Sequence, residues 1–299
     1  MSPESYSVAQ PQSITAHRAL FVLVGLGLLA LHLIGASTNP LDAPVLSALV
    51  ILVLGVPHGA FDVALWQSDQ RAANSQDLAI MLVKYISLAA LFFGLWLIVP
   101  ELALPVFLGI SIYHFSGDWS KDLDLAPRLI ATSAMIAAPA GLFREEVVEI
   151  FSWLAPEDTA RLLGMIMAAL SVPLLQASVV VIALLAIHRT WVAAELAVVL
   201  SLAWLMPPLL FFLVYFCGLH SVRHMLETHQ QLRCRTVGEF VFAAWPYAPL
   251  AIFGTLLGAV TLSSLPLGPA MLGTVFMALG SLTVPHIIVV EASGRHAAP

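Results

Sequence analysis

The amino-acid sequence predicts an all-α protein that crosses a membrane several times. Of its 299 residues, 60% are hydrophobic and 10% are charged, and the mean hydropathy is +0.94. A soluble domain carries about 25% charged residues. The apolar runs are continuous, whereas the strands of a membrane barrel alternate over about 10 residues. Because several runs approach the ~20 residues that span hydrocarbon as a helix, we expect a polytopic transmembrane helical bundle with about eight membrane helices.

The predicted helices follow the apolar runs in chain order. These runs cover residues 19–36, 42–57, 78–100, 102–115, 129–142, 162–187, 191–217, 240–265 and 269–290. Pro207 and Pro208 interrupt the run 191–217, because proline removes a backbone donor and clashes with the preceding turn. We therefore expect one helix to end near Leu205 and another to start at Pro208. Segment 143–161 mixes acidic and apolar residues, which indicates a helix lying in the membrane interface.

The remaining features bound the domain organisation and the partners. Residues 1–18 are rich in Ser, Pro and Gln and predict a polar flexible tail, followed by a single membrane domain at 19–292 and a C-terminal tail at 293–299. The net charge of −6 and the absence of a basic cluster argue against nucleic acid as a partner. Cys217 and Cys234 suggest neither a disulfide framework nor a CxxC metal site.

Histidines in the apolar segments are the strongest functional signal. Five of them lie within or at the ends of these segments, each in a short polar motif: His58, His114, His220, His224 and His286. Ionisable side chains are costly in the bilayer core and normally face the bundle interior, where they mark a functional site. Neutral imidazole is also the commonest protein metal ligand. We therefore predict a metal centre held between membrane helices.

The spacing of His220 and His224 supports this prediction. Residues four apart share one face of a helix about one turn from each other, so both imidazoles can bind one ion. The intervening Ser-Val-Arg lacks the glutamate of the HExxH zinc proteases, which argues against that class. On its own, such a pair is more often an accident or a hydrogen-bonded helix end.

Two other histidines are each followed by an aspartate four residues later. If these stretches are α-helical, Asp62 shares a face with His58, and Asp118 shares one with His114. A metal-bound imidazole usually donates its second N–H to a carboxylate or a carbonyl, which fixes its orientation. A His–Asp hydrogen bond at the interface without any metal is the alternative for each pair taken alone.

His286 is harder to assign. Glu291 follows it by five residues, a spacing that aligns the two side chains on a helix less directly than four. His286 is therefore a fifth ligand, a residue that supports a ligand, or a substrate contact. We place it outside the ligand set. Aromatic residues near helix ends usually form the interfacial belt. Those flanking the candidate ligands also suit a flat apolar substrate: Phe61, Tyr113, Trp119 and Tyr215. An all-imidazole site suits zinc, copper or iron, and the pattern does not separate these metals.

The sequence resembles the bacteriorhodopsin-related (Brp/Blh) family of membrane β-carotene 15,15′-dioxygenases. The resemblance extends from about residue 45 to residue 291 through four motifs: Pro-His-Gly-Ala-Phe-Asp, Tyr-His-Phe followed closely by Gly-Asp, Tyr-Phe-Cys-Gly-Leu-His-Ser-Val-Arg-His, and Val-Pro-His-Ile-Ile-Val-Val-Glu. It implies an enzyme that uses iron(II) and dioxygen to split the central double bond of β-carotene, or of a related carotenoid, into two retinal molecules. The iron ligands that it implies are His58, His114, His220 and His224.

The two aspartates match the family motifs to different degrees. Asp62 matches the acid of the first motif, whereas the serine in Tyr-His-Phe-Ser-Gly-Asp departs from the family pattern and leaves the supporting role of Asp118 open. His286 falls in the C-terminal Pro-His motif, but the resemblance gives it no ligand role. We expect a multi-pass protein of the inner cell membrane, with the lipid bilayer, a carotenoid and dioxygen as partners.

Other function classes remain open. A di-iron membrane hydroxylase or desaturase acting on a lipid or carotenoid would use HxxxH and HxxHH boxes, and this chain has one HxxxH and no His-His pair. A haem-binding electron carrier could use pairs of these histidines as axial ligands. A non-catalytic carotenoid- or retinal-binding protein or a transporter is the alternative from another class. A retinal Schiff base would need a buried lysine, and Lys84 and Lys121 lie near a helix start and in a loop.

Overall fold

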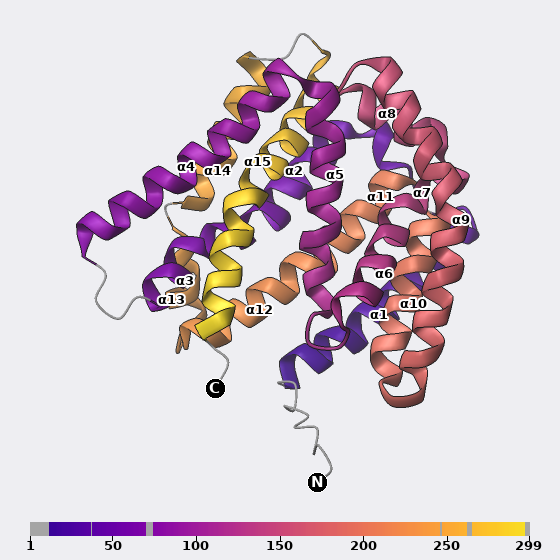
Figure 1. Cartoon of the computed structure of the whole chain (residues 1–299), viewed down its shortest axis with the longest axis horizontal. Helices are drawn as coiled ribbons and strands as arrows, with labels where there is room; N and C mark the ends of the chain where they lie inside the picture. Colours follow the sequence, from indigo (N-terminus) through magenta and orange to yellow (C-terminus); the bar gives the residue numbers. More distant parts are fainter. Residues whose placement is uncertain (1–11, 37, 70–73, 246, 262–264, 297–299) are drawn as a thin grey trace.

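The computed structural model describes residues 12–36, 38–69, 74–245, 247–261 and 265–296. Over these ranges the chain forms helices and no strand, which confirms the all-α class (Figure 1). The α-helices are α1 (Gln12–Leu33), α2 (Pro44–Val50), α3 (Asp62–Asp69), α4 (Ser75–Ile98), α5 (Pro100–Ser116), α6 (Leu125–Ala137), α7 (Pro139–Leu142), α8 (Arg144–Ser152), α9 (Glu157–His188), α10 (Thr190–Leu205), α11 (Pro208–Phe212), α12 (Ser221–Leu232), α13 (Val237–Ala244), α14 (Tyr247–Thr261) and α15 (Leu267–His296).

The number of membrane spans agrees with the sequence prediction. Seven helices of the described chain are long and apolar enough to cross a membrane, and α13 with α14 makes an eighth if the bent pair is one span. The break at Pro207 and Pro208 is also confirmed, because α10 ends at Leu205 and α11 begins at Pro208. Pro246, a further proline within the apolar run 240–265, lies outside the described residues.

Two of the spans leave regular α-helical geometry. Between α2 and α3, Ile51–Gly55 is π-helical and Val56–Phe61 is a 3₁₀ helix, and between α11 and α12, Leu213–His220 is π-helical. Pro57 cannot donate to the preceding turn, so the regular ladder breaks there. The two irregular segments touch, because the Phe216 ring occupies the space that a methyl group on Gly55 would need. Short π-helical segments occur frequently at functional sites. The first one here leads into the 3₁₀ helix that contains His58, and the second one ends at His220.

The helices differ in how much of their apolar surface the protein itself covers. Inner α10 has Leu196, Val199 and Leu202 fully buried. Outer α4 instead leaves Val83 and Leu91 64% and 71% exposed. A helix that is apolar on all sides is stable either inside a large core or in hydrocarbon. The outer surface of the bundle therefore suits contact with lipid.

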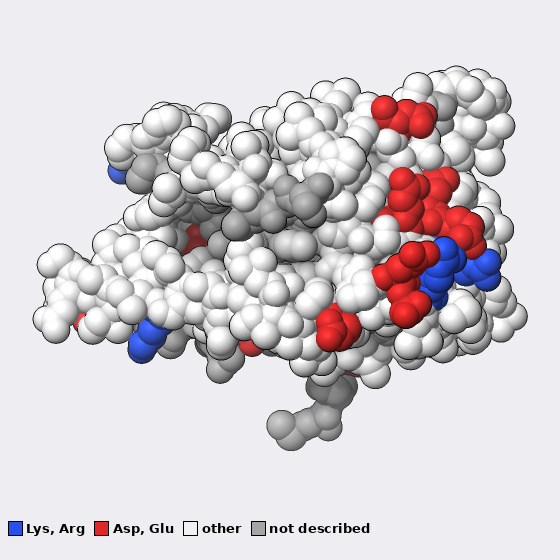
Figure 2. Space-filling model, turned by 90° about the horizontal axis from the view of Figure 1, so that it is seen from above, with Lys and Arg blue, Asp and Glu red and all other residues white. Residues whose placement is uncertain are grey.

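The charged residues separate toward two ends of the bundle. Viewed from above, acidic residues gather beside basic ones at one side of the upper end, where α8 and the start of α9 lie (Figures 1 and 2). The group comprises Arg144, Glu145, Glu146, Glu149, Glu157, Asp158 and Arg161. With nine residues, α8 is too short to span a bilayer and packs Val147, Val148, Ile150 and Phe151 inward, as an interfacial helix does.

At the opposite end, ion pairs join the beginnings and ends of several helices. Arg18 of α1 and Arg189 before α10 contact Asp122 at 2.8 and 2.7 Å, and Lys121 contacts Glu227 of α12 at 2.7 Å. The polar tail expected over residues 1–18 is thus helical from Gln12, and Arg18 is buried. Its burial is possible because carboxylates balance its charge.

Candidate metal centre

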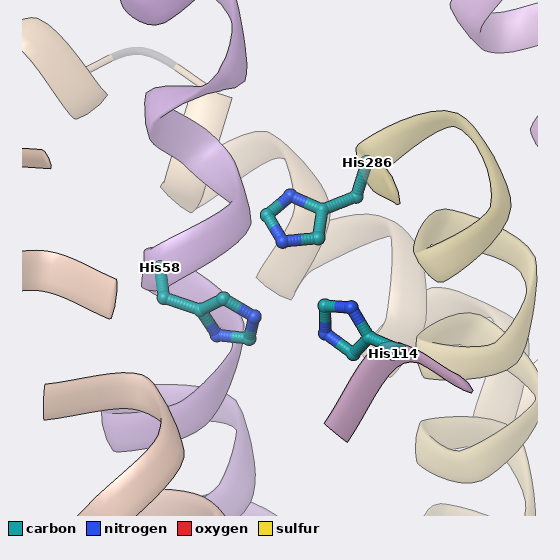
Figure 3. Close-up of side chains that lie close together, drawn as sticks. All are labelled: His58, His114 and His286. Atoms are coloured by element: carbon teal, nitrogen blue, oxygen red, sulfur yellow. The ribbon is translucent and has the colours of Figure 1, made fainter. Parts of the chain in front are cut away.

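Five imidazoles from three candidate spans and from α5 converge in the interior of the bundle. The ring centroid of His58 lies 5.2 Å from that of His220, 5.5 Å from that of His224 and 5.3 Å from that of His286. His114 joins from the end of α5, with its Nε2 3.0 Å from Nε2 of His220. Figure 3 shows the rings of His58, His114 and His286 directed toward one another.

The cluster has nearly the size of one coordination shell. One ligand nitrogen from each of His58, His114 and His286 lies within 4.8 Å of the others, and His224 and His286 form a second such group with Asp62. Two nitrogens that are each about 2.1 Å from one ion lie at most about 4.2 Å apart. Small movements of these side chains would therefore bring their nitrogens onto one ion. His58, His220 and His286 are buried.

Asp118 holds His220 in place. Nδ1 of His220 lies 3.0 Å from Oδ1 of Asp118, and the Tyr215 hydroxyl donates to Oδ2 of the same carboxylate at 2.6 Å. Asp118 lies in a short 3₁₀ turn after α5, outside the candidate spans. Burial alone would raise the pKa of this carboxyl, but His220, Arg223 and the Tyr215 hydrogen bond together hold the pKa below its usual range. A charged carboxylate at Nδ1 turns Nε2 of His220 toward the cluster.

Asp62 holds His286 in the same manner. Nδ1 of His286 lies 2.7 Å from Oδ1 of Asp62, and the Tyr85 hydroxyl donates to Oδ2 at 2.7 Å. The three residues come from α15, the start of α3 and α4. A carboxylate of the first motif thus supports the histidine of the last one.

The pairs expected within single helices are not formed. Nδ1 of His58 faces the backbone carbonyl of Gly55 and lies 3.3 Å from Oγ of Ser221, not against Asp62. The helix is 3₁₀ from Val56 to Phe61, and with 3.0 residues per turn a residue four positions on is rotated by about 120°. The same turn type follows His114, and it directs Asp118 to a histidine of another span.

The other predicted residues lie around the cluster in different settings. Phe61 stacks on Phe240 with centroids 4.2 Å apart, and Trp119 is fully buried, donating from Nε1 to Glu195 at 3.0 Å. Tyr113 donates to Glu291 at the edge of a polar cavity. Tyr215 serves as the donor to Asp118. The substrate contacts predicted for these aromatic residues remain predictions.

Several residues of the site escaped the sequence analysis. Tyr85 sits in an apolar run with no motif around it, and Ser221 and Thr228 resemble any polar residue of a helix end. Thr228 lies 3.4 Å from Nε2 of His224. Glu195, which binds Arg18, Arg223 and Trp119, carried a usable signal, because it is a lone acid within an otherwise apolar helix.

Two cavities of different character meet at the histidines. A cavity of about 230 Å³ is lined mainly by apolar side chains of α4, α14 and α15 and reaches His58, Asp62 and His286. A cavity of about 310 Å³ is lined by polar and charged side chains near the 117–124 segment and reaches His114, His220, His224 and His286. His286 borders both. The arrangement can hold a metal ion between an apolar compartment and a polar one.

Comparison with known proteins identifies the family. The β-carotene 15,15′-dioxygenase family matches residues 49–292. The β-carotene 15,15′-dioxygenase of an uncultured marine bacterium, 66A03, is 30% identical over 251 residues, which cover 81% of this chain and 90% of that protein. The probable β-carotene 15,15′-dioxygenase Blh of Halobacterium salinarum is 28% identical over 312 residues, covering 87% of each chain. No solved structure matches. The chain belongs to the β-carotene 15,15′-dioxygenase family, which confirms the resemblance and the prediction of a dioxygenase.

Proposed function

We propose that this member of the family cleaves the central 15,15′ double bond of β-carotene with dioxygen and gives two molecules of all-trans-retinal. Both oxygen atoms of dioxygen end in the two aldehyde groups, so the reaction needs no other reductant. The observation that carries the proposal is the convergence of buried imidazoles beside an apolar cavity within a bundle of membrane helices.

Iron(II) is the metal that we propose for the site, held by His58, His114, His220 and His224. A set of imidazoles without thiolate is compatible with iron. Bound iron(II) supplies the activation of dioxygen, which is chemistry that no side chain here provides. The chain supplies orientation: Asp118 and the Gly55 carbonyl each engage Nδ1 of a histidine, which leaves Nε2 of His220 and His58 free to face the ion.

The apolar cavity is the proposed binding site for one arm of the carotenoid. Its walls include Leu82, Ile86, Tyr247 and Leu250, of which Ile86 and Leu250 are 63% and 69% exposed on the outer surface. A substrate dissolved in hydrocarbon could therefore enter sideways between α4 and α14. At about 230 Å³ the cavity is smaller than the 300–1,000 Å³ of typical ligand pockets. It accommodates part of the polyene, and the remainder lies along the helices toward lipid.

We place the single membrane domain, residues 19–292, in the inner cell membrane with its basic end in the cytoplasm. Lys121, Arg189, Arg233 and Arg235 belong to the end at which α1 begins and α12 ends, whereas acids outnumber Arg144 and Arg161 at the α8 end. Basic residues near span ends favour the cytoplasmic side. A reporter fused after α15 should be active in its cytoplasmic form; activity only as a periplasmic reporter would contradict the orientation.

Expression in bacteria that accumulate β-carotene tests the activity. The expected result is bleaching of the cells together with retinal, identified by chromatography, and one iron per chain in the purified protein. Two irons per chain with a hydroxylated carotenoid would instead indicate the di-iron alternative. Bound carotenoid without any cleavage product, in iron-loaded protein supplied with dioxygen, would contradict the proposed reaction.

A further inference from the structure

One nitrogen at the centre of the cluster has no hydrogen-bonding partner. Nε2 of His286 is buried and, within the described part of the chain, accepts from no donor and donates to no acceptor. Leaving a buried polar atom unpaired costs about 1–3 kcal/mol. An unsatisfied group of this kind in a buried site points to an ion or a ligand that would complete it.

The other nitrogen of the same ring is firmly engaged. Nδ1 of His286 lies 2.7 Å from Asp62, whose second oxygen accepts from Tyr85. In the neutral imidazole, an Nδ1–H that donates to the carboxylate leaves the lone pair of the ring on Nε2. The ring is therefore oriented as a metal-binding imidazole is, with its lone pair directed away from the supporting acid.

That lone pair lies among the nitrogens already proposed as ligands. The centroid of the His286 ring is 5.0 Å from that of His224, 5.2 Å from that of His114 and 5.3 Å from that of His58. A ligand atom of His286 lies within 4.8 Å of one from His58 and one from His114 (Figure 3). The geometry does not separate His286 from the four histidines that the resemblance implies.

We infer that His286 is a fifth histidine ligand of the metal ion, and that Asp62 and Tyr85 are positioning residues that hold it. The inference rests on the proposed function for the presence of a metal and adds a ligand to its set. It reverses the expectation from sequence, which placed His286 outside the ligands. The Tyr215–Asp118–His220 group shows the same construction on a histidine that the resemblance already implies.

Metal binding by two variants tests the inference. His286→Gln keeps a polar side chain at the position but removes the imidazole, and His286→Gly opens a space that added imidazole can fill. His188→Ala, at the exposed end of α9, is the matched control. Each protein is loaded with iron(II) or with cobalt(II), and metal content, affinity and the visible cobalt spectrum are measured. We expect both variants to lose at least about 10-fold in affinity and to change the cobalt spectrum, and the control to match the parent.

The outcomes distinguish the inference from the proposed function. Recovery of the parent cobalt spectrum when imidazole is added to His286→Gly would support a ligand role and show that this variant is folded. An unchanged affinity and spectrum in His286→Gln would overturn the inference even if retinal formation were lost, because that pattern describes a substrate contact. A parent chain that binds neither metal would instead contradict the metal centre as a whole.

Discussion

Two Tyr–Asp–His groups hold histidines of the cluster, and their surroundings differ. Tyr215 and His220 are buried, Asp118 borders the polar cavity, and Arg223 donates to the Asp118 backbone carbonyl at 3.1 Å. Tyr85, Asp62 and His286 instead line the apolar cavity proposed for the substrate. The same local chemistry is thus anchored to a charged scaffold on one side and borders a binding space on the other. We call the first group the core side and the second the cavity side; under the proposed function, the core side would hold the metal and the cavity side would place it relative to the substrate.

Removing a ligand on the core side should have the largest effect. His220→Ala takes away an imidazole and leaves the Asp118 carboxylate buried without it, so we expect loss of bound iron and of retinal formation. Iron content and retinal yield in β-carotene-producing cells measure this, with His188→Ala as the control. Near-normal activity in His220→Ala would remove that residue from the ligand set.

The next largest effect should fall on the scaffold of the core side. Glu195 is fully buried between Arg18 and Arg223, so Glu195→Ala leaves the buried Arg223 guanidinium without its carboxylate and leaves Arg18 with Asp122 alone. We expect a loss of about 3–5 kcal/mol in the free energy of unfolding. Denaturation of the detergent-solubilised protein measures it. Glu157→Ala, which breaks the exposed pair with Arg161, should cost about 0–1 kcal/mol, and equal losses in the two variants would contradict the scaffold role.

The two aspartates give a direct comparison of the groups. Asp118→Asn and Asp62→Asn should each weaken iron binding about 10–100-fold, because the amide no longer fixes the proton of its histidine. We expect the larger loss for Asp118→Asn, since Asp118 also belongs to the charged scaffold. Competition with a chelator measures the affinities. Unchanged iron retention in either variant would exclude that aspartate from a supporting role.

The tyrosines should give the smallest effects. Tyr215→Phe and Tyr85→Phe each remove one hydrogen bond to a carboxylate, worth about 0.5–1.5 kcal/mol, so iron affinity should fall about 2- to 10-fold. Because Tyr85 borders the apolar cavity, Tyr85→Phe should also change KM for the carotenoid, whereas Tyr215→Phe should not. Identical changes of KM in both variants would remove the distinction between the two sides.

Much of the fold was predictable because it depends on composition and on proline. Continuous apolar runs predicted the spans, and Pro207 with Pro208 predicted the break between α10 and α11. The convergence of the histidines in the bundle interior was predictable because ionisable side chains are energetically costly in hydrocarbon.

The pairing of acids with histidines was not predictable. The expected His–Asp pairs assume an α-helix with 3.6 residues per turn. The segments that carry His58 and His220, Val56–Phe61 and Leu213–His220, are instead 3₁₀ and π-helical. Tyr85 and Asp62 reach His286 across three elements, and such tertiary contacts leave no mark in local spacing.

The π-helical stretch from Leu213 to His220 makes the effect of a one-residue deletion depend on where it falls. A wider turn stores a surplus residue relative to an α-helix, and shortening the chain by one residue there would restore the ordinary winding. Each residue of an α-helix advances the azimuth by about 100°. A single-codon deletion within Leu213–His220 would therefore be absorbed as the wide turn closes, whereas a deletion between His220 and His224 would rotate His224 away from its neighbours, although no histidine had been replaced.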